Sequence, residues 1–119
     1  MQNQEQTANQ QAFQEDNQQA IQPDVQTIEL DTPIMMGTIE ITSLEIRKPN
    51  VQALQGVKIS DLLQGDVTAI CTVLPRVCTP TLTKAQIIQM DTTDISQIGG
   101  ALFLFLQPKS IRAQMLLQQ

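Results

Sequence analysis

The fold class is decided by residues 27–47, which read TIELDTPIMMGTIEITSLEIR. Ile28 and Leu30 alternate with polar residues, and this period of two is typical of a strand with one buried face. Residues 31–37 contain Pro33 and Gly37, a pairing that indicates a turn. We therefore predict a β-hairpin over residues 26–47.

The return strand of this hairpin covers residues 38–47 and changes its apolar phase on the way. Its apolar positions are Ile39, Ile41, Leu44 and Ile46. The alternation switches between Thr42 and Ser43, and a bulge at that point would keep both halves on one face.

From residue 51 onward the apolar spacing is helical, with residues recurring at i, i+3 and i+4. Asp66 is a candidate N-cap, Pro75 is expected to end the helix that follows it, and Thr83 with Gln86 forms a capping box. Asp91 and Asp94 repeat that box before the last helix. The sequence predicts helices over about 51–64, 66–75, 83–90 and 93–106.

Both ends of the chain are polar. Residues 1–24 hold nine Gln and three Asn, so we expect a disordered Gln-rich arm that cannot offset its ordering entropy by burial. Residues 108–119 are expected to be a flexible or conditionally helical tail. The prediction is one α+β domain over residues 25–107, a hairpin followed by three to four short helices.

The composition excludes several classes of function. The chain of 119 residues has no His, Trp or Tyr, so histidine-based catalysis and His-bearing zinc sites are ruled out. Its net charge of −5 lacks the basic surface that nucleic acid requires, and no apolar run approaches the ~20 residues of a membrane span. We expect no enzyme activity, catalytic residue, cofactor or metal.

The remaining chemical groups have structural explanations. The acidic residues at helix starts are expected to cap those helices rather than to bind metal. Cys71 and Cys78 are expected to be reduced, partly buried thiols, with a disulfide as the alternative.

The most informative stretch is ALFLFL at residues 101–106, which is apolar on every side of its helix. Such a helix is either the central core element of a small domain or partly left uncovered for another chain. The candidate client or self-association patch consists of Gly99, Gly100, Phe103, Leu104, Phe105 and Leu106. The two glycines would allow another helix to approach closely.

The order of these features resembles the bacteriophage tail assembly chaperones, the group typified by the E protein of contractile-tailed temperate phages. The resemblance covers about residues 28–106. It is carried by the hairpin TIEITSLEIRKPN, then LQGVKISDLLQGDVTAI, LPRV, LTKAQIIQMDTTDI and the terminal ALFLFL. The Gln-rich arm departs from the compact start of the family.

The resemblance implies a non-enzymatic assembly factor of the host cytoplasm that is absent from the finished virion and binds the tape measure protein. Family members are often made in two lengths by a ribosomal frameshift, so a longer product that contacts the tail tube protein is also implied here. The frameshift would fall near Leu104, Phe105 and Leu106, if a slippery run of thymidines encodes them. The alternatives are a structural tail or virion component and a non-enzymatic adaptor or regulator. Self-association into a homo-oligomer is a further alternative, because a domain this small buries only a modest fraction of its surface by itself.

Overall fold

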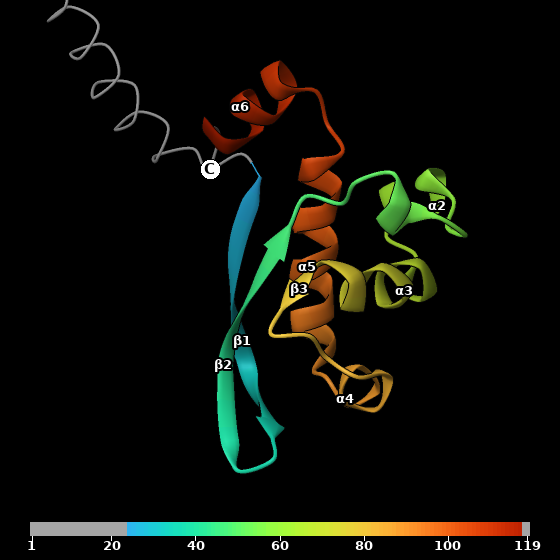
Figure 1. The fold of residues 1–119 in the computed structure, drawn as a ribbon. Helices are drawn as coiled ribbons and strands as arrows, with labels where there is room; N and C mark the ends of the chain where they lie inside the picture. The colour runs from blue at the N-terminus through green and yellow to red at the C-terminus, as the bar shows by residue number, and fades with distance from the viewer. Residues whose placement is uncertain (1–23, 118–119) are drawn as a thin grey trace, which may run out of the picture.

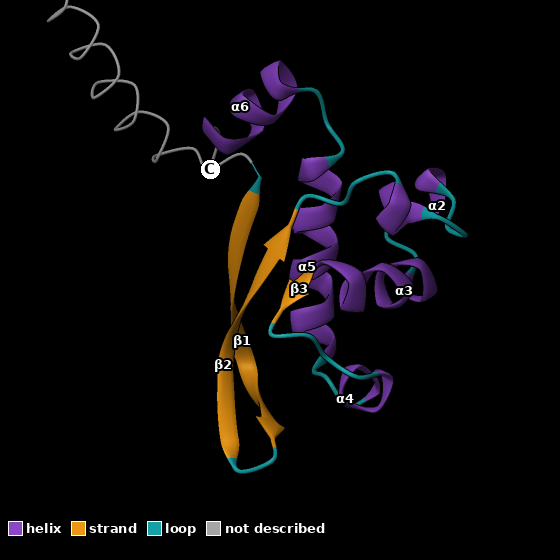
Figure 2. Cartoon of the chain, in the orientation of Figure 1, coloured by secondary structure: helices purple, strands orange, loops and turns teal. Residues whose placement is uncertain are grey.

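The structure, a computed structural model, describes residues 24–117, so the predicted disorder of the Gln-rich arm lies outside the described residues except at Asp24. The described part begins with an antiparallel hairpin of β1 (Val25–Met36) and β2 (Ile39–Arg47). A third, two-residue strand, β3 (Cys78–Thr79), pairs antiparallel with the other side of β2. Most of the helices lie to one side of this hairpin, and the last helix lies beyond the end of the hairpin where β1 begins (Figures 1 and 2). The predicted α+β order, hairpin first and helices after, is confirmed.

The hairpin is irregular at the level of Thr42, as the sequence indicated, but the bulge lies in β1 and not in the return strand where we expected it. Residues 25–29 of β1 pair with 43–47 of β2, whereas residues 34–36 pair with 39–41. Thr42 therefore faces four residues, 30–33, and the extra residues belong to β1 rather than to the return strand. The bulge lets β2 change its apolar phase while Leu44 and Ile46 stay buried.

The turn expected over residues 31–37 is replaced by a longer strand. β1 continues to Met36, and Gly37 makes the turn with a φ of +65°. The backbone amides of Asp31 and Thr32, within the bulge, donate to the Asp94 carboxylate at 2.7 and 3.2 Å. Because these donors have partners on a helix, the segment can leave the ladder and rejoin it beyond Pro33.

Within residues 24–117, the helical part comprises the 3₁₀ helix η1 (Gln52–Leu54) and five α-helices: α2 (Ile59–Leu63), α3 (Val67–Val77), α4 (Lys84–Ile88), α5 (Thr92–Phe105) and α6 (Lys109–Leu117). The single helix expected over residues 51–64 is divided into η1 and α2. Gln55 is extended and Gly56 takes a φ of +83°, which no helix can contain. The tail expected over residues 108–119 contains α6.

Helix α3 continues through Pro75, where we expected it to end. Pro75 has no N–H group to donate to the carbonyl four residues earlier, yet two more residues follow it in the helix. Arg76 adds support, because its Nη1 donates to the carbonyls of Ala53 and Gln55, both at 2.9 Å. These bonds attach the end of α3 to η1.

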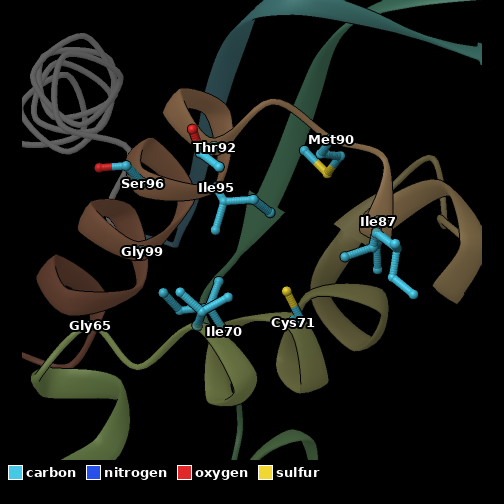
Figure 3. A pocket seen from close by; sticks show the side chains of 11 residues that line it. Gly65, Ile70, Cys71, Ile87, Met90, Thr92, Ile95, Ser96 and Gly99 are labelled. Atoms are coloured by element: carbon cyan, nitrogen blue, oxygen red, sulfur yellow. The ribbon is translucent and has the colours of Figure 1, made fainter.

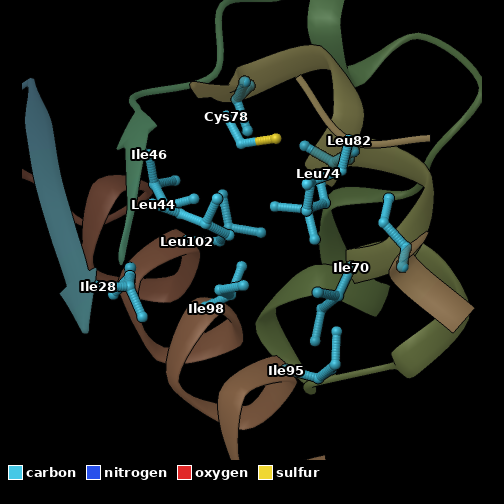
Figure 4. Packing of buried hydrophobic residues seen from close by; sticks show 14 of the residues in the cluster. Ile28, Leu44, Ile46, Ile70, Leu74, Cys78, Leu82, Ile95, Ile98 and Leu102 are labelled. Carbon is cyan, nitrogen blue, oxygen red and sulfur yellow. The ribbon is translucent and has the colours of Figure 1, made fainter. Parts of the chain in front are cut away.

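The hydrophobic core lies between the hairpin, α5 and α3 (Figure 4). The sheet contributes Leu44 and Ile46, α5 contributes Ile98 and Leu102, and α3 contributes Leu74, and all five side chains are buried. Helix α5 thus packs against the sheet and against α3. Because the sheet covers one side of α5, the side of α3 and α5 that faces away from the sheet is left for other contacts.

Candidate functional site

The structure spreads the predicted patch over three environments. Phe105 is buried in the core, Gly100 is exposed, and the remaining four residues are half-buried: Gly99, Phe103, Leu104 and Leu106. The stretch 101–106 is therefore partly a core element, because Ala101 and Leu102 are also buried. Its half-buried side chains are the ones that a partner could reach.

Gly99 does permit a close approach, but the neighbour is this chain's own α3. A Cβ atom at position 99 would lie 2.8 Å from Cδ1 of Ile70, well inside normal contact distance. At Gly100 a Cβ would meet nothing within 4 Å. The first glycine therefore fits α5 against α3, and the second lies on the open face of the helix.

A hollow of about 460 Å³ opens between α3, α4 and α5, beside Gly99 (Figure 3). Its lining is mainly aliphatic. We call this hollow the α3–α5 groove, and it is lined by Gly65, Val67, Ile70, Cys71, Ile87, Ile88, Met90, Thr92, Ile95, Ser96 and Gly99. Ile70, Ile87 and Ile95 form its buried floor. A groove of this size and chemistry accepts apolar side chains.

A second hollow of about 430 Å³ lies on the α4 side of α3 and shares four residues with the groove: Val67, Cys71, Ile87 and Ile88. Val67 is 60% exposed and Ile88 is 71% exposed. These two side chains are therefore apolar, open to solvent and flanked by hollows on both sides. Together they offer an apolar contact surface larger than the groove alone.

Helix caps hold the three walls in place. The Asp66 carboxylate accepts the amide of Ala69 at 2.9 Å and begins α3. Thr83 and Gln86 form the predicted capping box at the start of α4, with bonds of 2.8 and 3.2 Å. Each cap joins residues that are three apart in the sequence, so the starting points of α3 and α4, two walls of the groove, are set locally.

The second predicted capping box forms only in part. Asp91 caps α5 by accepting the amide of Thr93 at 2.8 Å. Asp94 was expected to return a bond to the start of α5, but its fully buried carboxylate binds Asp31 and Thr32 of β1. It therefore joins α5 to the bulge of the hairpin.

The chemistry of the groove is that of a contact surface. Burial raises the pKa of the Cys71 thiol, which lines the groove, so the thiol stays protonated near neutral pH. Cys71 and Cys78 are both free, as expected. Within residues 24–117, no three Cys, Asp or Glu side chains come close enough to hold a metal ion. None of the helices in that range is long and apolar enough to cross a membrane.

Val67 and Ile88 were not among the residues predicted for the patch. Val67 shares a helical spacing with the buried Ile70 and Leu74, yet it lies in the first turn of α3 and is 60% exposed. Ile88 ends α4. The available signal was the presence of two apolar side chains at helix ends, where polar residues are usual.

Comparison with known proteins places the sequence among related chains. The family model described as phage tail assembly chaperone proteins, E, or 41 or 14, matches residues 27–107. Tail assembly protein E of Escherichia phage P2 is 31% identical over 85 residues, which are 71% of this chain and 93% of the relative. Tail assembly protein E' of the same phage is 30% identical over 79 residues, 66% of this chain and 56% of the relative. No solved structure matches the chain.

Proposed function

Because the chain belongs to the family of phage tail assembly chaperone proteins, we propose that it binds the tape measure protein and keeps it soluble until the tail tube assembles around it. The role of the family is in assembly rather than in catalysis. The tape measure protein is the partner that we propose for this chain. We place the complex in the host cytoplasm and outside the mature virion.

The observation that carries the proposal is the exposure of Val67 and Ile88 between two apolar hollows. Exposed apolar side chains in a continuous patch favour association with another apolar surface. A helical client with an apolar stripe presents side chains at i, i+3, i+4 and i+7, which can enter a groove of this kind. The groove therefore supplies what a chaperone for a long helical client needs.

The predicted patch extends this surface along α5. Ser96, Gly99, Phe103 and Leu106 succeed one another at helical spacing, so they lie on one side of α5. The first two line the groove, and Phe103 and Leu106 are half-buried. We include Phe103 and Leu106 in the client surface, because they continue the line of the groove toward the end of α5.

The net charge of −5 supports the same role. A covered client is protected from aggregation only if the complex itself remains dispersed. Excess charge of one sign keeps proteins apart in solution. An acidic chaperone can therefore hold an apolar client without aggregating.

The test is co-expression with the tape measure protein of the same operon, measuring the fraction of that protein in the soluble lysate. Val67→Asp combined with Ile88→Asp should return the client to the insoluble fraction. The fold should persist, because both side chains are exposed and an acid at position 67 suits the start of a helix. Helical content by circular dichroism checks this.

The matched control is Val51→Asp, which changes an apolar side chain that is 76% exposed and lies outside the groove. This variant should protect the client as well as the unchanged protein does. If all variants protect the client equally, the client does not bind at Val67 and Ile88. Phe103→Asp would then test the far end of α5. No gain in client solubility from the unchanged protein would contradict the function itself.

We also propose that the chain has a longer frameshifted form that contacts the tail tube protein. The match to E' supports this, since the same region of our chain aligns with 56% of that relative. The nucleotide sequence around codons 104–106 tests it, because a frameshift there needs a slippery run. Mass spectrometry of purified virions separates a chaperone from a structural tail component, which would be retained in the particle.

A further inference from the structure

The fold brings Arg47 and Arg76 next to each other, although they are 29 positions apart in the sequence. Arg47 ends β2, and Arg76 lies two residues before β3, the strand that pairs with β2. The Arg47 guanidinium donates from Nη2 to the carbonyl of Arg76 at 3.4 Å and from Nη1 to the Thr79 hydroxyl at 2.6 Å. Both arginine side chains are exposed. Two of the seven cations of this acidic chain therefore meet at one point of its surface.

The Arg76 guanidinium is held in a fixed orientation, and its charge is not neutralised by an acid. Nη1 donates to the carbonyls of Ala53 and Gln55, both at 2.9 Å, which uses two of the five N–H groups of the side chain. Within residues 24–117 the other three, on Nε and Nη2, have no acceptor, and neither arginine forms an ion pair. The Nε–Nη2 edge is therefore left to hold a carboxylate by two parallel hydrogen bonds.

A hollow of about 410 Å³ opens beside Arg76, and its polar side chains offer N–H donors. It is lined by Asn50, Gln52, Ala53 and Arg76. The Asn50 side-chain oxygen already accepts the amide of Ala53 at 2.8 Å, so its NH₂ group is the part left for a ligand. No acid of the described residues lines the hollow. An oriented guanidinium with side-chain amides around it suits an anion, and its planar fork matches a carboxylate.

We propose that Arg76, the hollow beside it and Arg47 bind an acidic segment of a protein partner, with one carboxylate on Arg76 and a second near Arg47. Lys48 adds a third positive charge to this site. Glu45 is exposed on the same face of β2 as Arg47 and partly offsets its charge, so Arg76 carries the main contact.

The overall charge favours a peptide over a nucleic acid as the occupant. The chain has twelve acids against seven cations, so a long phosphate backbone would be repelled by the remaining surface. A short acidic segment needs only the two arginines and the hollow between their elements. Its carboxylates complement the local charge without covering the acidic parts of the surface.

This site is separate from the client surface proposed above. Neither arginine lines the α3–α5 groove or the second hollow. Arg76 follows Val67 by nine residues, which is about two and a half turns of α3, so the two side chains point to opposite sides of the helix. The chain can therefore hold an apolar stripe on one side of α3 and an acidic segment on the other. The proposal does not require that the client be the tape measure protein.

The test is an NMR titration of the full chain at low salt with a blocked tetraglutamate peptide, following the arginine side-chain N–H resonances. The Nε–H resonance of Arg76 should shift to saturation, and a blocked tetraglutamine peptide should leave it in place. Arg76→Gln should weaken binding by about tenfold or more, because hydrogen bonds to a charged group are lost. An Arg76 resonance that does not move with tetraglutamate would overturn the proposal.

Lys58→Gln is the matched control, because Lys58 is an exposed cation that does not line the hollow beside Arg76. It removes the same charge and should bind the peptide as tightly as the unchanged protein does. Equal weakening by Lys58→Gln and Arg76→Gln would overturn the proposal, since binding would then follow net charge alone. A single-stranded oligonucleotide that binds more tightly than tetraglutamate would overturn the choice of an acidic segment.

Arg76→Gln also removes two hydrogen bonds to the η1 region, so its fold is checked by circular dichroism. If this variant unfolds, Arg76→Lys replaces it. Lysine keeps the charge but lacks the paired N–H groups of the guanidinium, so the affinity should fall several-fold. An affinity equal to that of the unchanged protein would overturn the contact through the Arg76 fork.

Discussion

Replacement of the buried carboxylate of Asp94 by an amide should destabilise the domain strongly. The side chain is 0% exposed and accepts two backbone amides from β1, Asp31 at 2.7 Å and Thr32 at 3.2 Å. In Asp94→Asn one oxygen remains as an acceptor, but the other position becomes a donor that faces an N–H group. Hydrogen bonds to charged groups contribute about 1.5–3 kcal/mol each, so the expected loss is about 2–3 kcal/mol.

A competing effect has the opposite sign. A buried carboxylate is costly to desolvate, and a neutral amide removes that cost. We expect the hydrogen bonds to dominate, because Asp94 also lies in the first turn of α5, where the helix dipole favours a negative charge by about 0.3–1 kcal/mol. The net loss corresponds to a fall in melting temperature of about 10–20 °C for a domain of this size.

The assay is urea unfolding followed by circular dichroism, since the chain has no Trp or Tyr to serve as a fluorescent probe. Asp61→Asn is the control, because Asp61 is also a first-turn carboxylate but makes no side-chain hydrogen bond within residues 24–117. Hydrogen exchange at the Asp31 and Thr32 amides should accelerate only in Asp94→Asn. Equal stability of the two variants would refute the reasoning and show that desolvation dominates.

Three further outcomes are expected. Gly100→Ala should stabilise the protein by up to about 1 kcal/mol, because Ala favours a helix and its methyl group has free space there. Gly99→Ala should lose that gain, because its methyl group would collide with Ile70. Equal melting temperatures of the two variants would contradict this. The Thr32 hydroxyl and the Thr93 amide lower the pKa of Asp91, so the stability that Asp91 provides is present above its unfolded pKa and is lost as the pH falls below about 4. Thr32→Val should make acid unfolding shallower in that range. Alkylation of Cys71 should be slow at pH 7, accelerate as the pH rises, and slow again when client occupies the groove.

Features set by neighbouring residues were predictable from the sequence. The caps of α3 and α4 each involve residues three apart, so their patterns can be recognised without knowledge of the fold. The alternation of β2 likewise showed where the hairpin is irregular, at Thr42. In each case the partners are close along the chain.

Features set by distant residues were not predictable. Asp94 binds residues more than sixty positions away, and nothing near it distinguishes that contact from a second capping box. The pairing of β3 with β2 depends on where α3 ends. Pro75 indicated an end at residue 75, whereas α3 continues to Val77. Local pattern cannot show which donors the folded chain brings to a given acceptor.

The candidate site falls between these cases. Gly99 was recognised as a point of close approach, although its neighbour proved to be Ile70 of the same chain. Val67 and Ile88 belong to amphipathic helices, and only the packing of α4 beside α3 leaves both open to solvent. A helical pattern predicts which side is apolar but not how much of that side remains uncovered.

The floor of the α3–α5 groove consists of core residues, so a ligand bound in the groove should raise the melting temperature of the protein. Ile70, Ile87 and Ile95 belong both to the groove and to the buried cluster, so the groove exists only in the folded chain. A ligand that binds only the folded state at a hundred times its dissociation constant adds about 2.7 kcal/mol to the free energy of unfolding. Synthetic peptides that cover the client sequence can therefore be ranked by the rise in melting temperature each one causes.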